Sequence, residues 1–195
     1  MYKYQELALH FATFYLHTIL AITETLGIVK HVNLHLKSYP ECNKLLYYRQ
    51  SGFRSNHSCQ TALIKYIDEW LSAIDNNEIV STVFIYLSIA FDFVNHDIFL
   101  EKLKLYGMHE TTIKCFSSYL KDRDQQTYVS WTLSNFGKVV SGVPQGSVLA
   151  PTLFLVYIND LPLVLSECIV DSFADDSTIS AHNKNLDQVA STLWN

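Results

Sequence analysis

The stretch CIVDSFADDSTISA, residues 168–181, decides the fold of this chain. Each end reads as a short strand of β-branched and small residues, and Ala174, Asp175 and Asp176 separate the two. The local sequence leaves two readings of the aspartate pair open. Asp side chains accept backbone N–H bonds in hairpin turns, and carboxylate oxygens also bind divalent cations.

A cation site at this turn needs another carboxylate from a partner strand. Enzymes that transfer phosphoryl groups with two metal ions bring carboxylates together from separate strands, so that the ions stabilise both the attacking and the leaving oxygen. A candidate partner strand spans residues 79–87, which are rich in β-branched and aromatic residues.

Helical periodicity is clearest at residues 58–76, where Asn76 and Asn77 provide a stop signal. The apolar residues of this segment form one stripe at three- and four-residue spacing: Leu63, Tyr66, Ile67, Trp70, Leu71 and Ile74. We further expect a short helix and a loop at 31–50, helices at 95–106 and 111–121 with Gly107 ending the first, a hairpin at 125–141 and a helix at 147–159.

The composition is that of a folded, intracellular protein with one domain, or one domain and an appendage. Of its 195 residues, 49% are hydrophobic and 13% aromatic, which excludes disordered and collagen-like classes. The four cysteines lack metal-ligand spacing, and His31 and His35 have no third ligand beside them, so no zinc site is expected. The net charge of −5 disfavours nucleic acids as partners, because phosphate neutralisation supplies most of that affinity.

An apolar segment, LALHFATFYLHTILAITETLGIV, occupies residues 7–29 and carries a single charge, Glu24. It is long enough to span a bilayer, but it is only moderately apolar and has no strong basic flank. We therefore expect a buried or surface-docked helix, and membrane association through residues 7–29 is the alternative.

Four blocks of the sequence stand in a distinctive order: QSGFRSNHSCQTAL (50–63), VFIYLSIAFDFVNHD (83–97), SGVPQGSVLAPTLFLVYINDLP (141–162) and FADD (173–176). In this order and spacing they resemble the reverse transcriptases of non-LTR (long interspersed element) retrotransposons. The resemblance implies an α+β fold, a right-hand polymerase palm with an antiparallel sheet backed by helices, with partial fingers and no thumb. The expected parts are an apolar N-terminal helix at 1–30, partial fingers at 31–81 and the palm at 82–195.

The resemblance also implies functions for individual residues. Asp175 matches the metal ligand of the polymerase turn, with Asp176 as its companion, and the implied ion is Mg²⁺. Phe91 matches the aromatic gate that lies against the nucleotide sugar and disfavours a 2′-hydroxyl. Arg54 belongs to the fingers side, where it either lies near nucleic acid or is an ordinary surface arginine. The loop beside the template base and incoming nucleotide, residues 141–146, contributes Gly142, Pro144, Gln145 and Gly146.

The sequence departs from the family pattern at its first catalytic position. Where the family carries an aspartate that bridges both metal ions, this chain has Tyr86, and Ile89 replaces a lysine. A phenol is uncharged near neutral pH and cannot supply the missing carboxylate. Asp92 lies six residues further on, after the expected strand, so we do not expect it to substitute for the lost aspartate.

Other departures agree with this reading. Ala150 replaces a glycine, and Trp131 replaces the hairpin glycine and should disfavour a tight turn. The fingers strand that grips the nucleotide is missing upstream of QSGFR, and no primer grip, thumb or endonuclease region is expected.

We therefore predict a degenerate reverse transcriptase domain without polymerase activity. Its ancestral partners are an RNA template and a DNA primer, and the net negative charge weakens binding to both. The alternatives are a non-catalytic module that binds RNA or protein, a membrane-associated protein derived from a transposon, and a translated relic without a selected function.

Overall fold

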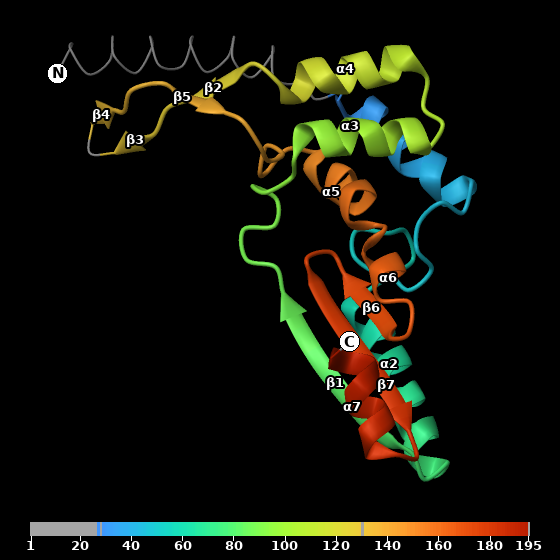
Figure 1. Ribbon diagram of the computed structural model, residues 1–195. Helices are drawn as coiled ribbons and strands as arrows, with labels where there is room; N and C mark the ends of the chain where they lie inside the picture. Colours follow the sequence, from blue (N-terminus) through green and yellow to red (C-terminus); the bar gives the residue numbers. More distant parts are fainter. Residues whose placement is uncertain (1–26, 28, 130, 195) are drawn as a thin grey trace, which may run out of the picture.

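The computed structural model describes residues 27, 29–129 and 131–194 (Figure 1). A helix covers residues 29–42 and leads through a loop into the remaining elements. These are α2 (Cys59–Asp75), β1 (Ile79–Tyr86), α3 (His96–Leu105), α4 (Glu110–Leu120), β2 (Arg123–Gln125), β3 (Tyr128–Val129), β4 (Thr132–Leu133), β5 (Gly137–Val139), α5 (Ala150–Ile158), α6 (Leu161–Val164), β6 (Ile169–Phe173), β7 (Asp176–Asn183) and α7 (Leu186–Trp194).

The central feature is a three-stranded antiparallel sheet in the order β1-β7-β6. β1 pairs with β7 along its whole length, from Ile79 opposite Asn183 to Tyr86 opposite Asp176. Helix α2 contacts β1 and β6, and α7 contacts β7 and β1. In Figure 1, α7 lies in front of the sheet and α2 behind it. The predicted α+β fold, with an antiparallel sheet backed by helices, is confirmed. The boundary that we predicted between the partial fingers and the palm, between residues 81 and 82, falls inside β1.

Local capping explains where α2 begins and where α3 begins and ends. Ser58 and Thr61 form a reciprocal capping box at the start of α2, and the side chain of Asn95 accepts backbone N–H bonds at the start of α3. Gly107 follows α3 with a φ of +76°, a conformation that glycine adopts without strain. The helices and strands predicted between residues 31 and 181 are confirmed to within a few residues, and the helix expected at 7–29 lies largely outside the described residues.

One expectation about an individual element needs correction. Helix α5 begins at Ala150 rather than at 147, where the Ser147 hydroxyl accepts from the Ala150 N–H at 3.1 Å. The apolar stripe of α2 is mostly exposed, at Leu63, Ile67, Leu71 and Ile74, and only Tyr66 and Trp70 are half-buried. The residues that α2 buries are Ala62 and Ala73, so its small-residue face makes the close contacts.

The predicted hairpin forms as two nested strand pairs, β2 with β5 and β3 with β4. Trp131 precedes β4 with a φ of 65° and an almost fully exposed side chain. A short connection between β3 and β4 therefore forms despite a bulky residue in the left-handed region, against our expectation for Trp131.

The hydrophobic core lies among α3, α4 and α5 above the sheet. Its fully buried side chains are Val94, Phe99, Leu103, Leu120, Leu153, Phe154 and Val156. Ala174, from the turn between β6 and β7, belongs to the same cluster. The aspartate turn is therefore held against the core.

The apolar N-terminal segment lies largely outside the described residues, and membrane association through it stays a prediction. Within the part of the chain that the structure describes, no helix is both long enough and apolar enough to cross a bilayer.

Candidate active site

The predicted catalytic positions meet where β1 ends and β6 turns into β7. Asp176 pairs with Tyr86 on one side and with Phe173 on the other. The Leu87 N–H donates to the Asp175 carbonyl at 3.3 Å, which fixes the turn against the end of β1. Because opposite residues in antiparallel strands have Cα atoms about 4.5–5.5 Å apart, Tyr86 stands directly beside the two aspartates.

A buried glutamine holds the aspartate turn from the opposite side. The Gln50 side-chain oxygen accepts hydrogen bonds from the Gly52 N–H at 2.8 Å and from the Ala174 N–H at 3.0 Å. Gln50 is only 3% exposed, and it forms a parallel bridge with Ser172 on β6. A Cβ atom on Gly52 would lie 2.3 Å from the Ala174 nitrogen, so only glycine fits there.

Gln50 and Gly52 are site residues that the sequence analysis did not single out. Both residues could have been selected from the sequence, because both stand in the QSGFR block. From that block we selected Arg54, whose guanidinium donates to the Tyr47 and Gln50 carbonyls at 3.1 and 3.0 Å. In this structure Arg54 is half-buried and does not line the pocket described below.

Beneath this block, a buried ion-pair network joins residue 49, β6 and α2. Arg49 donates to the Asp171 carboxylate at 2.9 and 2.6 Å and to Glu69 Oε1 at 2.8 Å. Burial alone would lower the pKa of Arg49, but the hydrogen bonds to Glu69 and Asp171 raise it above its ordinary value. The hydrogen bond from Arg49 lowers the pKa of Glu69. The network therefore fixes the segment that carries Gln50.

The loop at residues 141–146 packs against the chain that follows β1. Gly142 has a φ of +86°, and a Cβ atom there would lie 2.8 Å from the Asp92 Cα. The Val143 N–H donates to the Phe91 carbonyl at 2.9 Å. Gln145 Nε2 donates to the Asp92 carboxylate at 2.9 Å, so Gln145 holds Asp92 at this loop.

A pocket of about 410 Å³ opens between this loop, the end of β1 and the aspartate turn. Its lining comprises Phe53, Tyr86, Ile89, Ala90, Phe91, Gln145, Gly146, Ser147, Ala150, Pro151 and Asp175. Phe91 stacks on the core residue Phe154, with ring centroids 4.5 Å apart, and meets Phe53 edge-on at 6.3 Å. The structure thus brings Phe91, Gln145, Gly146 and Asp175 to one pocket.

Three non-glycine residues with positive φ surround this pocket. Phe53 has a φ of 53°, Ile89 of 57° and Ala174 of 58°. For a β-branched residue such as Ile89 this conformation is rare, and each such residue costs about 1–3 kcal/mol. The backbone around the pocket is therefore strained, which is typical of functional sites.

The charges at the pocket do not match a two-metal site. Among the described residues, Asp175 and Asp176 form no ion pair, and no three potential ligands from His, Cys, Asp and Glu gather to hold an ion. At the end of β1, where a third carboxylate would be needed beside Asp175 and Asp176, the chain has the exposed phenol of Tyr86. The residues present do not fit a pair of divalent cations.

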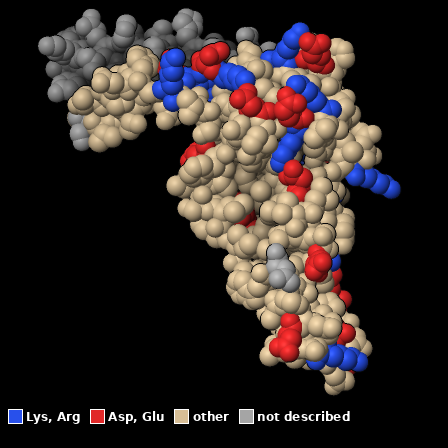
Figure 2. Space-filling view, viewed as in Figure 1, with Lys and Arg blue, Asp and Glu red and all other residues tan. Residues whose placement is uncertain are grey.

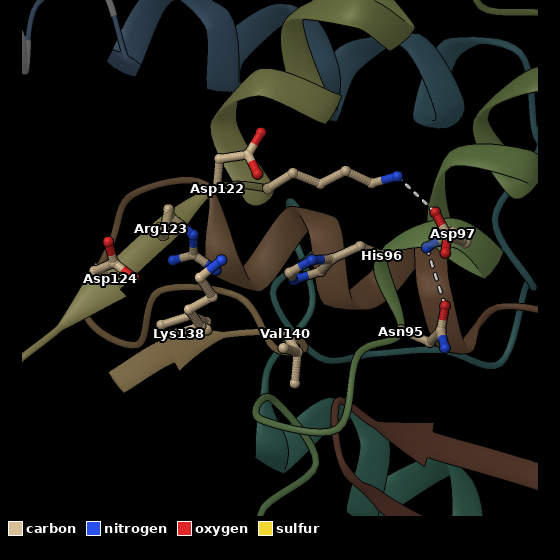
Figure 3. A pocket seen from close by; sticks show the side chains of 10 residues that line it. Asn95, His96, Asp97, Asp122, Arg123, Asp124, Lys138 and Val140 are labelled. Atoms are coloured by element: carbon tan, nitrogen blue, oxygen red, sulfur yellow. Dashed lines mark hydrogen bonds and ion pairs between the residues drawn. The ribbon is translucent and has the colours of Figure 1, made fainter. Parts of the chain in front are cut away.

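A second hollow, of about 380 Å³, lies where the hairpin leaves α4 (Figure 3). Lys121 pairs with Asp97 at 2.6 Å, and His96 and Arg123 contact the Gly142 carbonyl at 2.8 and 3.0 Å. These side chains fix the hairpin and the loop at Gly142. On the face drawn in Figure 2, acidic and basic residues are interspersed over the upper helices and form no continuous basic stripe.

The amino-acid sequence is similar to the sequences of a known protein family. The family described as "Reverse transcriptase (RNA-dependent DNA polymerase)" matches residues 27–193. The RNA-directed DNA polymerase from mobile element jockey of Drosophila melanogaster is 29% identical over 70% of this chain. The probable RNA-directed DNA polymerases from transposon BS and transposon X-element of the same fly are 37% and 30% identical over 58% and 69% of the chain.

The chain spans 16%, 12% and 15% of the lengths of these three relatives, so it matches less than a fifth of each. Among solved structures, apo telomerase from Candida tropicalis superimposes with a TM-score of 0.62 at 11% identity. The superposition covers 87% of this chain and 36% of the telomerase chain, and it confirms the polymerase fold. The chain belongs to the reverse transcriptase (RNA-dependent DNA polymerase) family, with relatives among the non-LTR mobile elements of Drosophila.

Proposed function

We propose that this chain is a reverse transcriptase domain that no longer polymerises DNA. The observation that carries the proposal is Tyr86, which pairs with Asp176 at the position where the family carries a metal-bridging aspartate. The ancestral reaction is RNA-directed DNA synthesis from deoxynucleoside triphosphates with Mg²⁺.

The end of β1 carries too little negative charge to hold a pair of metal ions. Two divalent cations need several anionic oxygens, and the turn supplies two carboxylates, Asp175 and Asp176, beside a neutral phenol. Removal of one preorganised stabilising group typically costs enzymes roughly 10²–10³ in rate. A lost bridging ligand should cost at least as much.

Within this proposal the other residues keep the positions that the resemblance implies. In the ancestral enzyme, Phe91 lies against the sugar, and Gly142, Pro144, Gln145 and Gly146 lie beside the template base and the nucleotide. Asp92 does not rescue the site, because it lies at the loop of residues 141–146, where Gln145 donates to its carboxylate, and does not line the pocket with Asp175. Arg54 stabilises its own loop through the Tyr47 and Gln50 carbonyls rather than contacting nucleic acid.

Primer extension on an RNA template, with Mg²⁺ and deoxynucleoside triphosphates, tests the proposal. We expect no incorporation above background by the unmodified chain, and none by Tyr86→Phe, which keeps the ring and removes the hydroxyl. Robust incorporation by the unmodified chain would overturn the proposal.

A metal titration provides a second test. It does not require this part of the polymerase to extend a primer by itself. Tyr86→Asp should bind Mn²⁺, a spectroscopic substitute for Mg²⁺, at least about tenfold more tightly than the unmodified chain, because a third carboxylate joins the site. Equal Mn²⁺ affinities of the two proteins would contradict the assignment of Tyr86 as the cause of inactivity.

A further inference from the structure

The pocket at the end of β1 combines aromatic side chains with a single charge. Of the described residues that line it, only Asp175 carries a charged side chain, and three are aromatic: Phe53, Tyr86 and Phe91. No described Lys, Arg or His pairs with the Asp175 carboxylate. The pocket therefore presents an unneutralised negative charge beside exposed rings.

This lining disfavours a nucleoside triphosphate. A polyphosphate is held by Arg and Lys side chains or by bound cations, and none of the described residues that line this pocket is basic. Ile89, with its side chain more than half exposed, lines the pocket and provides only apolar surface. Without metal ions, Asp175 would repel a phosphate group.

The same lining suits an organic cation. Tyr86 is 71% exposed and Phe53 is 46% exposed, so both rings can accept a cation or a flat ligand against a face. Phe91 is fixed by its stack on Phe154, and Ala90 and Pro151 add apolar surface. The volume of about 410 Å³ is sufficient for a small molecule.

We infer that this pocket binds a planar organic cation, an amidinium or guanidinium group on an apolar body, in place of a nucleoside triphosphate. Asp175 accepts hydrogen bonds from the cation, and Tyr86 and Phe53 contact its flat face. The inference rests on the proposed loss of the metal pair, because a bound metal ion would neutralise Asp175.

A series of three ligands of one shape isolates the charge. Benzamidine is cationic, benzamide is neutral and benzoate is anionic, and each is titrated in metal-free buffer with ligand-observed NMR and calorimetry. For an open pocket we expect benzamidine to bind with a dissociation constant of roughly millimolar order, about fivefold or more tighter than benzamide. Benzoate should not bind. Equal affinity for benzamidine and benzamide would overturn the inference.

Variants connect the preference to the named residues. Asp175→Asn should abolish the preference for benzamidine over benzamide. Tyr86→Phe should retain binding, whereas Tyr86→Ala should weaken it severalfold. Asp68→Asn removes an exposed carboxylate on α2 that forms no described ion pair, and it should change nothing. Circular dichroism confirms that each variant is folded. An unchanged preference in Asp175→Asn would assign the cation to another site and overturn the inference.

A separate nucleotide titration distinguishes failure of this inference from failure of the proposed function. The unmodified chain is titrated with thymidine triphosphate in the presence of Mg²⁺. Binding of this complex more tightly than benzamidine would contradict both the loss of the metal pair and the present inference. If neither ligand binds, the cation pocket is wrong and the inactive polymerase stands.

Discussion

At the scale of single residues, Gly52 and Ala174 approach more closely than a side chain allows. A Cβ atom at position 52 would lie 2.3 Å from the Ala174 nitrogen and 2.9 Å from its Cα, and both are backbone atoms. Gln50 fixes the same contact, because one oxygen accepts from both residues. This close contact and the two hydrogen bonds hold the aspartate turn against residues 50–52.

We therefore expect Gly52→Ala to lower the free energy of unfolding by about 1–3 kcal/mol, as overpacking does. A Gly→Ala change in a compatible conformation usually stabilises by about 0.4–1 kcal/mol, so the sign is informative. Urea denaturation gives the measurement. The control is Gly137→Ala in β5, where a Cβ atom would lie 3.9 Å from the Gln125 carbonyl oxygen, an ordinary van der Waals contact. Equal midpoints for the two variants would contradict the close approach.

Which site residues the sequence can reveal depends on how far their partners lie along the chain. Asp175, Asp176 and Tyr86 stand in motifs, and the structure places them side by side. The function of Gln50 depends on Ala174, more than a hundred residues later. The QSGFR block contains Gln50, but a local pattern does not show which distant residue it contacts, so we selected Arg54 from that block instead.

At the scale of elements, one arginine connects a loop, a strand and a helix. Arg49 and Asp171 are 7% and 3% exposed, and Glu69 on α2 completes the network. Arg49→Met would leave the Asp171 carboxylate buried with only Lys65, 3.7 Å away, as a partner. Breaking a buried pair in this way costs about 3–5 kcal/mol.

The pH dependence of this loss follows from Glu69, whose pKa Arg49 lowers from a reference value of 4.5. A carboxylate with a lowered folded pKa stabilises the fold above its unfolded pKa, and this stabilisation is lost as the pH falls through the folded value. Urea midpoints of Arg49→Met and the unmodified chain should therefore differ most near neutral pH, and the difference should narrow as the pH falls below 4.5. Lys114→Met, which removes an exposed pair with Glu110, is the control, with a change of about 0.5 kcal/mol or less. A constant difference across pH would contradict the coupling.

Elements were predicted more reliably from the sequence than the faces they bury. The strands at 169–173 and 176–183 and the helix at 59–75 follow from β-branched runs, periodicity and caps. The face of α2 did not follow, because its packing uses Ala62 and Ala73 and leaves Leu63 and Ile67 exposed. Close approach to a sheet favours small side chains, and periodicity of large ones does not reveal it.

At the scale of the whole molecule, charge limits the choice of partner. The formal net charge is −5, and the face in Figure 2 mixes both signs. We expect no retardation of an RNA–DNA hybrid in gel-shift assays near physiological salt, and at most weak binding at low salt. The control is the same assay with a charge-reversed variant, Asp122→Lys with Asp124→Lys, beside Arg123. Tight binding by the unmodified chain that declines steeply with added salt would contradict this expectation.

The order of strands in the sheet has a consequence during synthesis. The middle strand, β7, is made last, so β1 and β6 have no sheet partner in β7 until it emerges from the ribosome. At about 5–20 residues per second, the roughly 90 residues between Tyr86 and Asp176 take about 5–18 seconds to translate. During that interval β1 presents unpaired backbone N–H and C=O groups, the kind of strand edge that makes partly folded chains prone to aggregation.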